Sequence, residues 1–206
     1  MIPLIGIPTG VAAVMALVLT MVVLAQRRAA LALKQLAITE PLTGLANRRE
    51  FERVLDAEIA RTSRTGRPFT VVLIDLDRLK LINDRCGHRA GDRAILRVAN
   101  ALRVSRRAPD TAGRLGGDEF AVILPESHEA MALRFVRRVR DVVASHRRAG
   151  IVTISGGVAE HPRDGATAEA LLEAADRALY AEKQRRNRST PASIPRVKRD
   201  GVRAEA

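Results

Sequence analysis

Two glycines run directly into two carboxylates in the segment 114–120, and an apolar run follows at 120–124. Glycines allow a tight turn and let a ligand lie against bare backbone. A hairpin turning at Gly116 would present Asp118 and Glu119 at its tip. Carboxylates at such a tip suit a hard cation, and a hard cation beside amide N–H groups suits a phosphate. The same pattern also fits a surface turn with two solvated acids.

Two further acids, Asp75 and Asp77, end the apolar run 69–76, which predicts a buried strand. An acid at a strand end can simply cap the next helix. The spacing also begins like a calcium loop, but a lysine stands where that loop needs Gly and a cysteine where it needs Glu. If this strand neighbours the hairpin, Asp75 and Asp118 would meet. Two carboxylates with a backbone carbonyl and phosphate oxygens suit Mg²⁺.

The polar, glycine-punctuated segment 80–92 lies between a short predicted helix and a long one. Asn83 offers a donor beside an acceptor, and Asp92 offers two acceptors, so together they can read the edge of guanine. Each also fits a structural role, Asn83 as a helix C-cap and Asp92 as an N-cap. His88 taken alone fits a structural hydrogen bond better than a ligand.

Five ordered blocks of this sequence resemble the GGDEF family, the diguanylate cyclases that condense two GTP into cyclic dimeric GMP. The resemblance covers residues 40–188, and chance does not produce five blocks in order with compatible spacing. The blocks are residues 41–49, 75–92, 114–120, 153–157 and 175–183.

The resemblance implies an α+β fold, a nucleotidyl-cyclase-like palm with a ferredoxin-like antiparallel sheet and helices on its faces. It implies two Mg²⁺ or Mn²⁺ ions per active site, held by Asp75, Asp118, Glu119 and the backbone carbonyl of Leu76. Asp118 and Glu119 would be the catalytic carboxylates, with Asp118 as the base for the 3′-hydroxyl. Because an ordinary Asp is a weak base for an alcohol, the metal must lower the pKa of that hydroxyl.

The resemblance also implies how GTP is held. Asn83 and Asp92 would read guanine, and His88 and Gly116 would lie at the substrate. The triphosphate would contact the following positions: the backbone at Leu79 and Lys80, and the side chains of Lys183 and Arg186.

An Arg-x-x-Asp element, Arg107 to Asp110, ends shortly before the glycines, where the family has its inhibitory product site. The guanidinium group of Arg can donate two hydrogen bonds to a phosphate or stack on guanine, and the carboxylate of Asp can accept hydrogen bonds from the guanine edge. A surface loop with an incidental ion pair is the alternative.

Two departures from the family pattern stand out. Glu40 replaces the usual Asp before 41–45, and its longer arm is expected to cap that turn less well. The segment after Lys183 is one residue shorter than usual and lacks a Gly, which leaves Arg186 as the expected phosphate ligand and Arg185 as a candidate.

Apolar spacing predicts the elements that position these residues. Four helices are expected: one at 51–65 that Gly66 closes, one at 90–107, one that begins after Ser127 as its cap, and one at 168–183. Strands are expected at 69–76, before the glycines, at 120–124 and at 151–159. Helices alternating with strands around a central hairpin indicate one sheet with helices on its faces.

Composition separates the ends of the chain from this domain. The single Cys86 excludes a disulfide framework. Half of the formal net charge of +12 lies in residues 183–206, and few aromatic residues accompany it. We therefore interpret 189–206 as a basic disordered tail near an anionic membrane surface and expect no nucleic-acid binding.

The segment 1–26 is almost entirely apolar, with its regular helix beginning near Thr9. Basic residues follow at once, so we predict an uncleaved transmembrane anchor, a helical linker at 27–39 and a catalytic domain at 40–188 in the cytoplasm. A cleaved signal peptide is the competing interpretation. The expected location is the inner (cytoplasmic) membrane, with a single pass.

The sequence therefore predicts a diguanylate cyclase, active as a homodimer because each domain supplies half of a two-GTP site. The alternative is a non-catalytic module that binds cyclic dimeric GMP or GTP for a partner. A nucleic-acid binder acting through the tail is a weaker third possibility.

Overall fold

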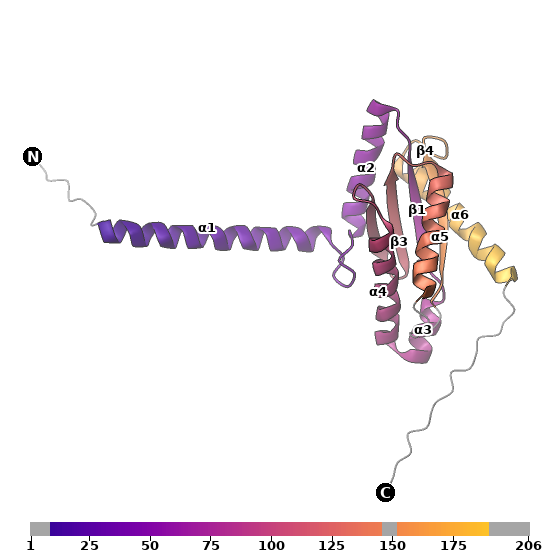
Figure 1. The fold of residues 1–206 in the computed structure, drawn as a ribbon, viewed down its shortest axis with the longest axis horizontal. Helices are drawn as coiled ribbons and strands as arrows, with labels where there is room; N and C mark the ends of the chain where they lie inside the picture. Colours follow the sequence, from indigo (N-terminus) through magenta and orange to yellow (C-terminus); the bar gives the residue numbers. More distant parts are fainter. Residues whose placement is uncertain (1–8, 146–151, 190–206) are drawn as a thin grey trace, which may run out of the picture.

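The computed structural model describes residues 9–145 and 152–189, so the predicted tail and the first residues of the predicted anchor lie outside the described part. Ten elements follow one another in these described residues, coloured in sequence order in Figure 1. They are α1 (Thr9–Ile38), α2 (Arg48–Thr65), β1 (Phe69–Leu76), α3 (Leu79–Cys86), α4 (His88–Ser105), β2 (Thr111–Gly116), β3 (Glu119–Pro125), α5 (Glu129–Ser145), β4 (Ile154–His161) and α6 (Ala168–Ser189).

The four described strands form one sheet in the order β2-β3-β1-β4, and every neighbouring pair is antiparallel. The predicted α+β sheet with helices on its faces is therefore confirmed. In the register, Asp75 at the end of β1 lies between Glu119 of β3 and Ser155 of β4. The acidic end of β1 is thus central in the sheet rather than at its edge.

Both faces of the sheet are buried, which is why β1 reads as a continuous apolar run rather than an alternating one. Side chains alternate between the faces, so Val72 and Ile74 pack with α4 and α5, while Phe69 and Val71 pack with α2 and α6. Figure 1 shows α4 and α5 together in front of the sheet.

Local signals fix both ends of α2. Asn47 caps α2 by accepting from the N–H of Glu50, and Gly66 ends it with φ of 67°, a left-handed conformation that suits glycine. The predicted cap at Ser127 is wrong. α5 begins at Glu129, whose N–H donates to Oε2 of Glu160 at 2.8 Å, so the cap comes from β4.

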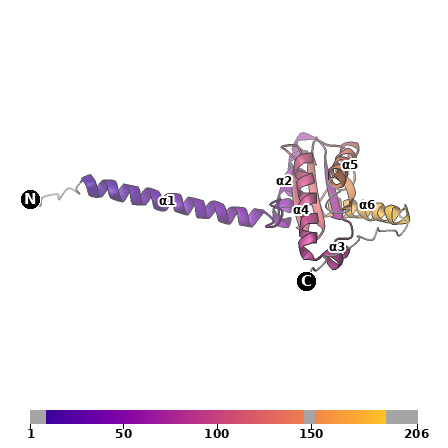
Figure 2. The ribbon, with the colours of Figure 1, turned by 60° about the horizontal axis from the view of Figure 1, so that its bottom comes forward.

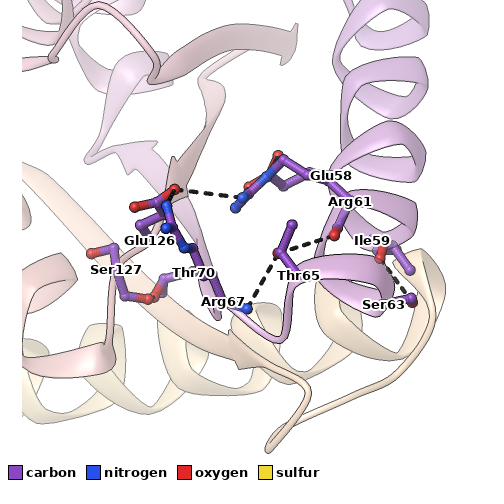
Figure 3. Close-up of polar contacts among 9 residues, drawn as sticks. All are labelled: Glu58, Ile59, Arg61, Ser63, Thr65, Arg67, Thr70, Glu126 and Ser127. Carbon is purple, nitrogen blue, oxygen red and sulfur yellow. Dashed lines mark hydrogen bonds and ion pairs between the residues drawn. The ribbon is translucent and has the colours of Figure 1, made fainter.

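A charged cluster joins the end of α2 to the turn after β3, far from the acidic strand end. Glu126 pairs with both Arg61 and Arg67, at nitrogen–oxygen distances of 3.6 and 2.8 Å, and Figure 3 shows the three side chains together. Arg61 also pairs with Glu58 at 2.7 Å. The hydroxyl of Thr70 donates to the carbonyl of Ser127 at 2.6 Å, which holds the same turn onto β1.

Helix α1 begins at Thr9, as the sequence predicts, and runs without a break to Ile38. Both ribbon views show it extending away from the sheet and its helices (Figures 1 and 2). In the part of the chain that the structure describes, no helix has the length and apolar character that a membrane span requires, so the predicted transmembrane helix is not confirmed.

Candidate active site

The pairing of β1 with β3 brings the two acidic segments together, as the sequence predicts for neighbouring strands. The turn between β2 and β3 consists of Gly117 and Asp118, and Gly117 has φ of 49°. The N–H of Leu76 donates to the carbonyl of Asp118 at 3.0 Å. Asp118 therefore lies at the end of β1, next to Asp75.

Asp75 is the most perturbed carboxylate of this site. Its side chain is 13% exposed, and Nζ of Lys183 lies 2.7 Å from its Oδ2. Burial raises the pKa of Asp75, Lys183 opposes this, and the negative charges of Asp118 and Asp77 add to the rise, so the pKa lies above its ordinary value. The predicted triphosphate ligand Lys183 thus already lies at the carboxylates.

Glu119 occupies a different environment from Asp118. Its side chain is 59% exposed and lies 3.6 Å from a guanidinium nitrogen of Arg48. Nε of Arg48 donates to the carbonyl of Leu115 at 3.2 Å. The two acids of the turn are therefore separated, with Asp118 toward β1 and Glu119 toward α2.

The donor set fits a cation in part. Among residues 9–145 and 152–189, no group of three or more His, Cys, Asp or Glu side chains could hold a metal ion. Asp75 and Asp118 repel each other strongly enough to contribute to the raised pKa of Asp75. Two neighbouring carboxylates suit a hard cation that completes its shell with phosphate oxygens.

The guanine-reading residues predicted from the sequence lie at the α3–α4 junction. Gly87 ends α3, and its N–H donates to the carbonyl of Asn83 at 2.8 Å. A Cβ at Gly91 would lie 2.0 Å from Oδ1 of Asn83, so the Asn83 amide rests against bare backbone of α4. Asp92 lies inside α4 and does not cap it, because the residue at that N-cap is Gly87.

The other predicted substrate residues lie at the ends of α3, α4 and β2. His88 begins α4 and is exposed, Leu79 and Lys80 form the first turn of α3, and Gly116 ends β2. Arg186 donates a hydrogen bond to the carboxylate of Asp77.

Asp77 is a structural anchor that sequence reasoning did not assign. Its carboxylate accepts from the hydroxyls of Thr153 and Ser155, each at 2.7 Å, and from Arg186 at 3.0 Å. Arg186 also donates to the carbonyl of Ile154. The predicted phosphate ligand Arg186 therefore ties α6 to the end of β1.

The turn also has a support that the sequence did not reveal. Arg114 donates through Nε and one terminal nitrogen to the carbonyl of Gly117, at 3.1 and 2.8 Å, and through the other to Glu40 at 3.0 Å. One end of the signature turn is thereby fixed to the segment that follows α1.

Glu40 caps its turn well, so the expectation that it would cap poorly is wrong. Its carboxylate accepts from the N–H groups of Leu42 and Thr43, at 3.2 and 2.8 Å, and from the Thr43 hydroxyl at 2.6 Å. Burial alone would raise the pKa of Glu40, but these hydrogen bonds and the charge of Arg114 outweigh it, and the pKa is lowered. The longer arm of Glu reaches both the turn and Arg114.

The Arg-x-x-Asp element forms a closed turn. Asp110 is 4% exposed, and its Oδ2 accepts from the backbone N–H of Arg107 at 2.7 Å. A small cavity of about 60 Å³ lies beside it, lined by Arg134 and Arg138 of α5 as well as by Arg107 and Asp110. The carboxylate holds the turn, and three arginines line the cavity.

A family model described as "Diguanylate cyclase, GGDEF domain" matches residues 37–189, which is most of the chain. The chain belongs to the GGDEF family. Among relatives, the response regulator PleD of Caulobacter vibrioides is 42% identical over 156 residues, covering 72% of this chain and 34% of PleD. The diguanylate cyclase DosC of Escherichia coli K12 is 39% identical over 157 residues, covering 71% of this chain and 33% of DosC.

Solved structures agree with this GGDEF assignment. The coiled coil and GGDEF domain of DgcB from Caulobacter crescentus, solved with c-di-GMP, superposes with a TM-score of 0.76 at 31% identity. The match covers 84% of this chain and 94% of that one. This chain spans about a third of the length of the curated relatives PleD and DosC.

Proposed function

We propose that this chain is a diguanylate cyclase that condenses two GTP into cyclic dimeric GMP and releases two pyrophosphates. The observation that carries the proposal is the adjacency of Asp75 and Asp118 at one strand end of a GGDEF domain. DosC is named for this activity, and DgcB was solved with the product. The amide of Asn83, which lies against Gly91, gives the site a group that can read guanine.

In this proposal the residues of the site have the following tasks. Asn83 and Asp92 orient guanine, while Lys183, Arg186 and the backbone at Leu79 and Lys80 hold the triphosphate. Asp118 accepts the proton of the 3′-hydroxyl as its oxygen bonds to the α-phosphorus of the second GTP, and the bond to pyrophosphate breaks. A divalent cation at Asp75 and Asp118 would lower the pKa of that hydroxyl and offset charge on the leaving group.

The cavity beside Arg107 supports a product-inhibition site. Asp110 is committed to its own turn, so we assign phosphate recognition to the guanidinium groups of Arg107, Arg134 and Arg138. In an inhibited enzyme, Arg107→Ala relieves inhibition by the product and leaves the uninhibited rate intact. In a receptor without catalysis, the same change abolishes binding and no GTP is consumed.

Dimerisation and membrane attachment are further parts of the proposal. The match to DgcB with its coiled coil covers 84% of this chain, against 72% for the DgcB GGDEF domain alone, which supports a helical stalk before the domain. A stalk that pairs two copies would bring two half-sites together and raise their effective concentration. The apolar side chains of α1 from Val14 to Leu24 are exposed, which supports attachment of α1 to the inner membrane.

The test is the purified full-length chain with GTP and Mg²⁺, followed by chromatography of the nucleotides. We expect cyclic dimeric GMP with a rate per chain that rises with protein concentration until dimers form. Asp118→Asn should lower turnover by about a thousandfold or more, and Glu119→Gln by less, because Glu119 is exposed and paired with Arg48. Absence of product at every protein concentration would refute the cyclase.

A further inference from the structure

An open cavity of about 430 Å³ lies at the β4 edge of the sheet, between α5 and α6. These helices pack on opposite faces of the sheet, so the cavity wraps around the strand at Gly156. Four arginines line it, two from each helix: Arg137, Arg140, Arg185 and Arg186. Except for Arg186, the proposed reaction uses none of them.

Glu182 is the one carboxylate among the described residues that line this cavity, and its oxygens are already used. One oxygen pairs with Arg140, and the other accepts from the N–H of Gly156 at 2.9 Å. The lining therefore carries an excess of positive charge. Guanidinium groups gathered around a concave surface attract anions and match the oxygens of a phosphate.

The cavity adjoins the phosphate end of the proposed GTP site. Arg186 lines it and also donates to Oδ2 of Asp77 at 3.0 Å, two residues beyond Asp75. Gly156 follows Ser155, the residue that pairs with Asp75 in the sheet. The strand end and the cavity therefore share Arg186.

We propose that this cavity binds inorganic pyrophosphate, the leaving group of the proposed condensation, on its way out of the active site; the identity of the ligand rests on the proposed function. Pyrophosphate is the compact polyanion that the reaction delivers beside Arg186. In the described part of the chain, no aromatic side chain lines the cavity, so it offers no aromatic surface for stacking a base.

The experiment is calorimetric titration of the full-length chain with pyrophosphate in EDTA, where metal-dependent binding at Asp75 and Asp118 is absent. Arg137 is exposed on α5 and lies outside the catalytic machinery. Arg137→Gln should weaken binding about tenfold, the effect of losing one charge-assisted contact. Arg137→Lys should recover part of the affinity. Arg177→Gln, an equal loss of charge on α6 at a residue paired with Glu173, should change nothing.

Equal affinity in wild type and Arg137→Gln, or no binding at all, would overturn the proposal. Binding of ATP without binding of pyrophosphate would also overturn it and assign the cavity to a nucleotide. Cyclase turnover measured on the same preparations separates this result from the function. If the chain makes product but shows no Arg137-dependent binding, only the proposed cavity site is refuted. If the chain is inactive but shows that binding, the anion site stands and the proposed reaction is refuted.

Discussion

Lys183 lies 2.7 Å from Asp75, and this ion pair joins α6 to the end of β1. Lys183 is the counter-charge of Asp75, a carboxylate whose pKa is raised by burial and by the neighbouring acids Asp118 and Asp77. A cation or a triphosphate arriving at the site must therefore share or displace one partner of the pair. The pair makes the site sensitive to changes on a helix far away in sequence.

The Lys183–Asp75 pair should be measurable by a double-mutant cycle in EDTA. Lys183→Met and Asp75→Asn each break the pair, and we expect a coupling free energy of about 1–2 kcal/mol from thermal or urea unfolding. Mg²⁺ with GTP should reduce that coupling, because the ligands compete for both partners. A cycle between Arg177 and Asp75 serves as the control and should give no coupling. Zero coupling for Lys183 and Asp75 would show that the pair is not formed in solution.

Gly91→Ala tests the assignment of Asn83. The added Cβ would lie 2.0 Å from Oδ1 of Asn83 and must push that amide away. We expect KM for GTP to rise about tenfold, as for loss of a hydrogen-bonding group to the substrate. Asn83→Ala should give a similar rise, and the double variant should add little, since both act on one contact. An unchanged KM in Gly91→Ala would remove Asn83 from guanine recognition.

Glu40→Gln tests the support of the signature turn. The change keeps the size of the side chain but removes the charge opposite Arg114, so stability should fall by about 1–3 kcal/mol. Because the folded pKa of Glu40 is lowered, its contribution is present above its ordinary pKa of 4.5 and is lost as pH falls through the folded value. The exposed Glu173→Gln should cost less than about 0.5 kcal/mol. Urea unfolding at pH 7 compares the two variants.

A second pH dependence is expected at His161, which ends β4 on the side away from Asp75. Its ring stacks on Phe69 with centroids 4.9 Å apart, and burial lowers the pKa of His161 against a weaker opposing hydrogen bond that the ring donates to the backbone of Ala166. The unfolded chain takes up a proton near the ordinary pKa of 6.5, so stability should fall as pH drops below about 6.5. His161→Phe should show a smaller loss of Tm between pH 7.5 and pH 5.5 than wild type. An equal loss in both would exclude His161 as the cause.

The sequence by itself determined the family and the order of the helices and strands, although β4 (Ile154–His161) lies two to three residues beyond the strand expected at 151–159. Apolar runs and glycines gave β1 its bounds and ended α2 at Gly66, because those signals act within a few residues. Five ordered motifs identified the GGDEF family and its candidate carboxylates. Adjacency of Asp75 and Asp118 could be expected as soon as their strands were taken as neighbours.

Only the tertiary structure decided which partners these residues have. Asp77 binds hydroxyls from β4, Arg114 joins Glu40 to the signature turn, and α5 takes its cap from Glu160 rather than from Ser127. Each contact joins residues more than 30 positions apart, and its energy depends on burial and geometry that no local pattern encodes. The sequence determined which groups are available for chemistry, whereas packing of α6 and the segment after α1 against the sheet decided how those groups are held.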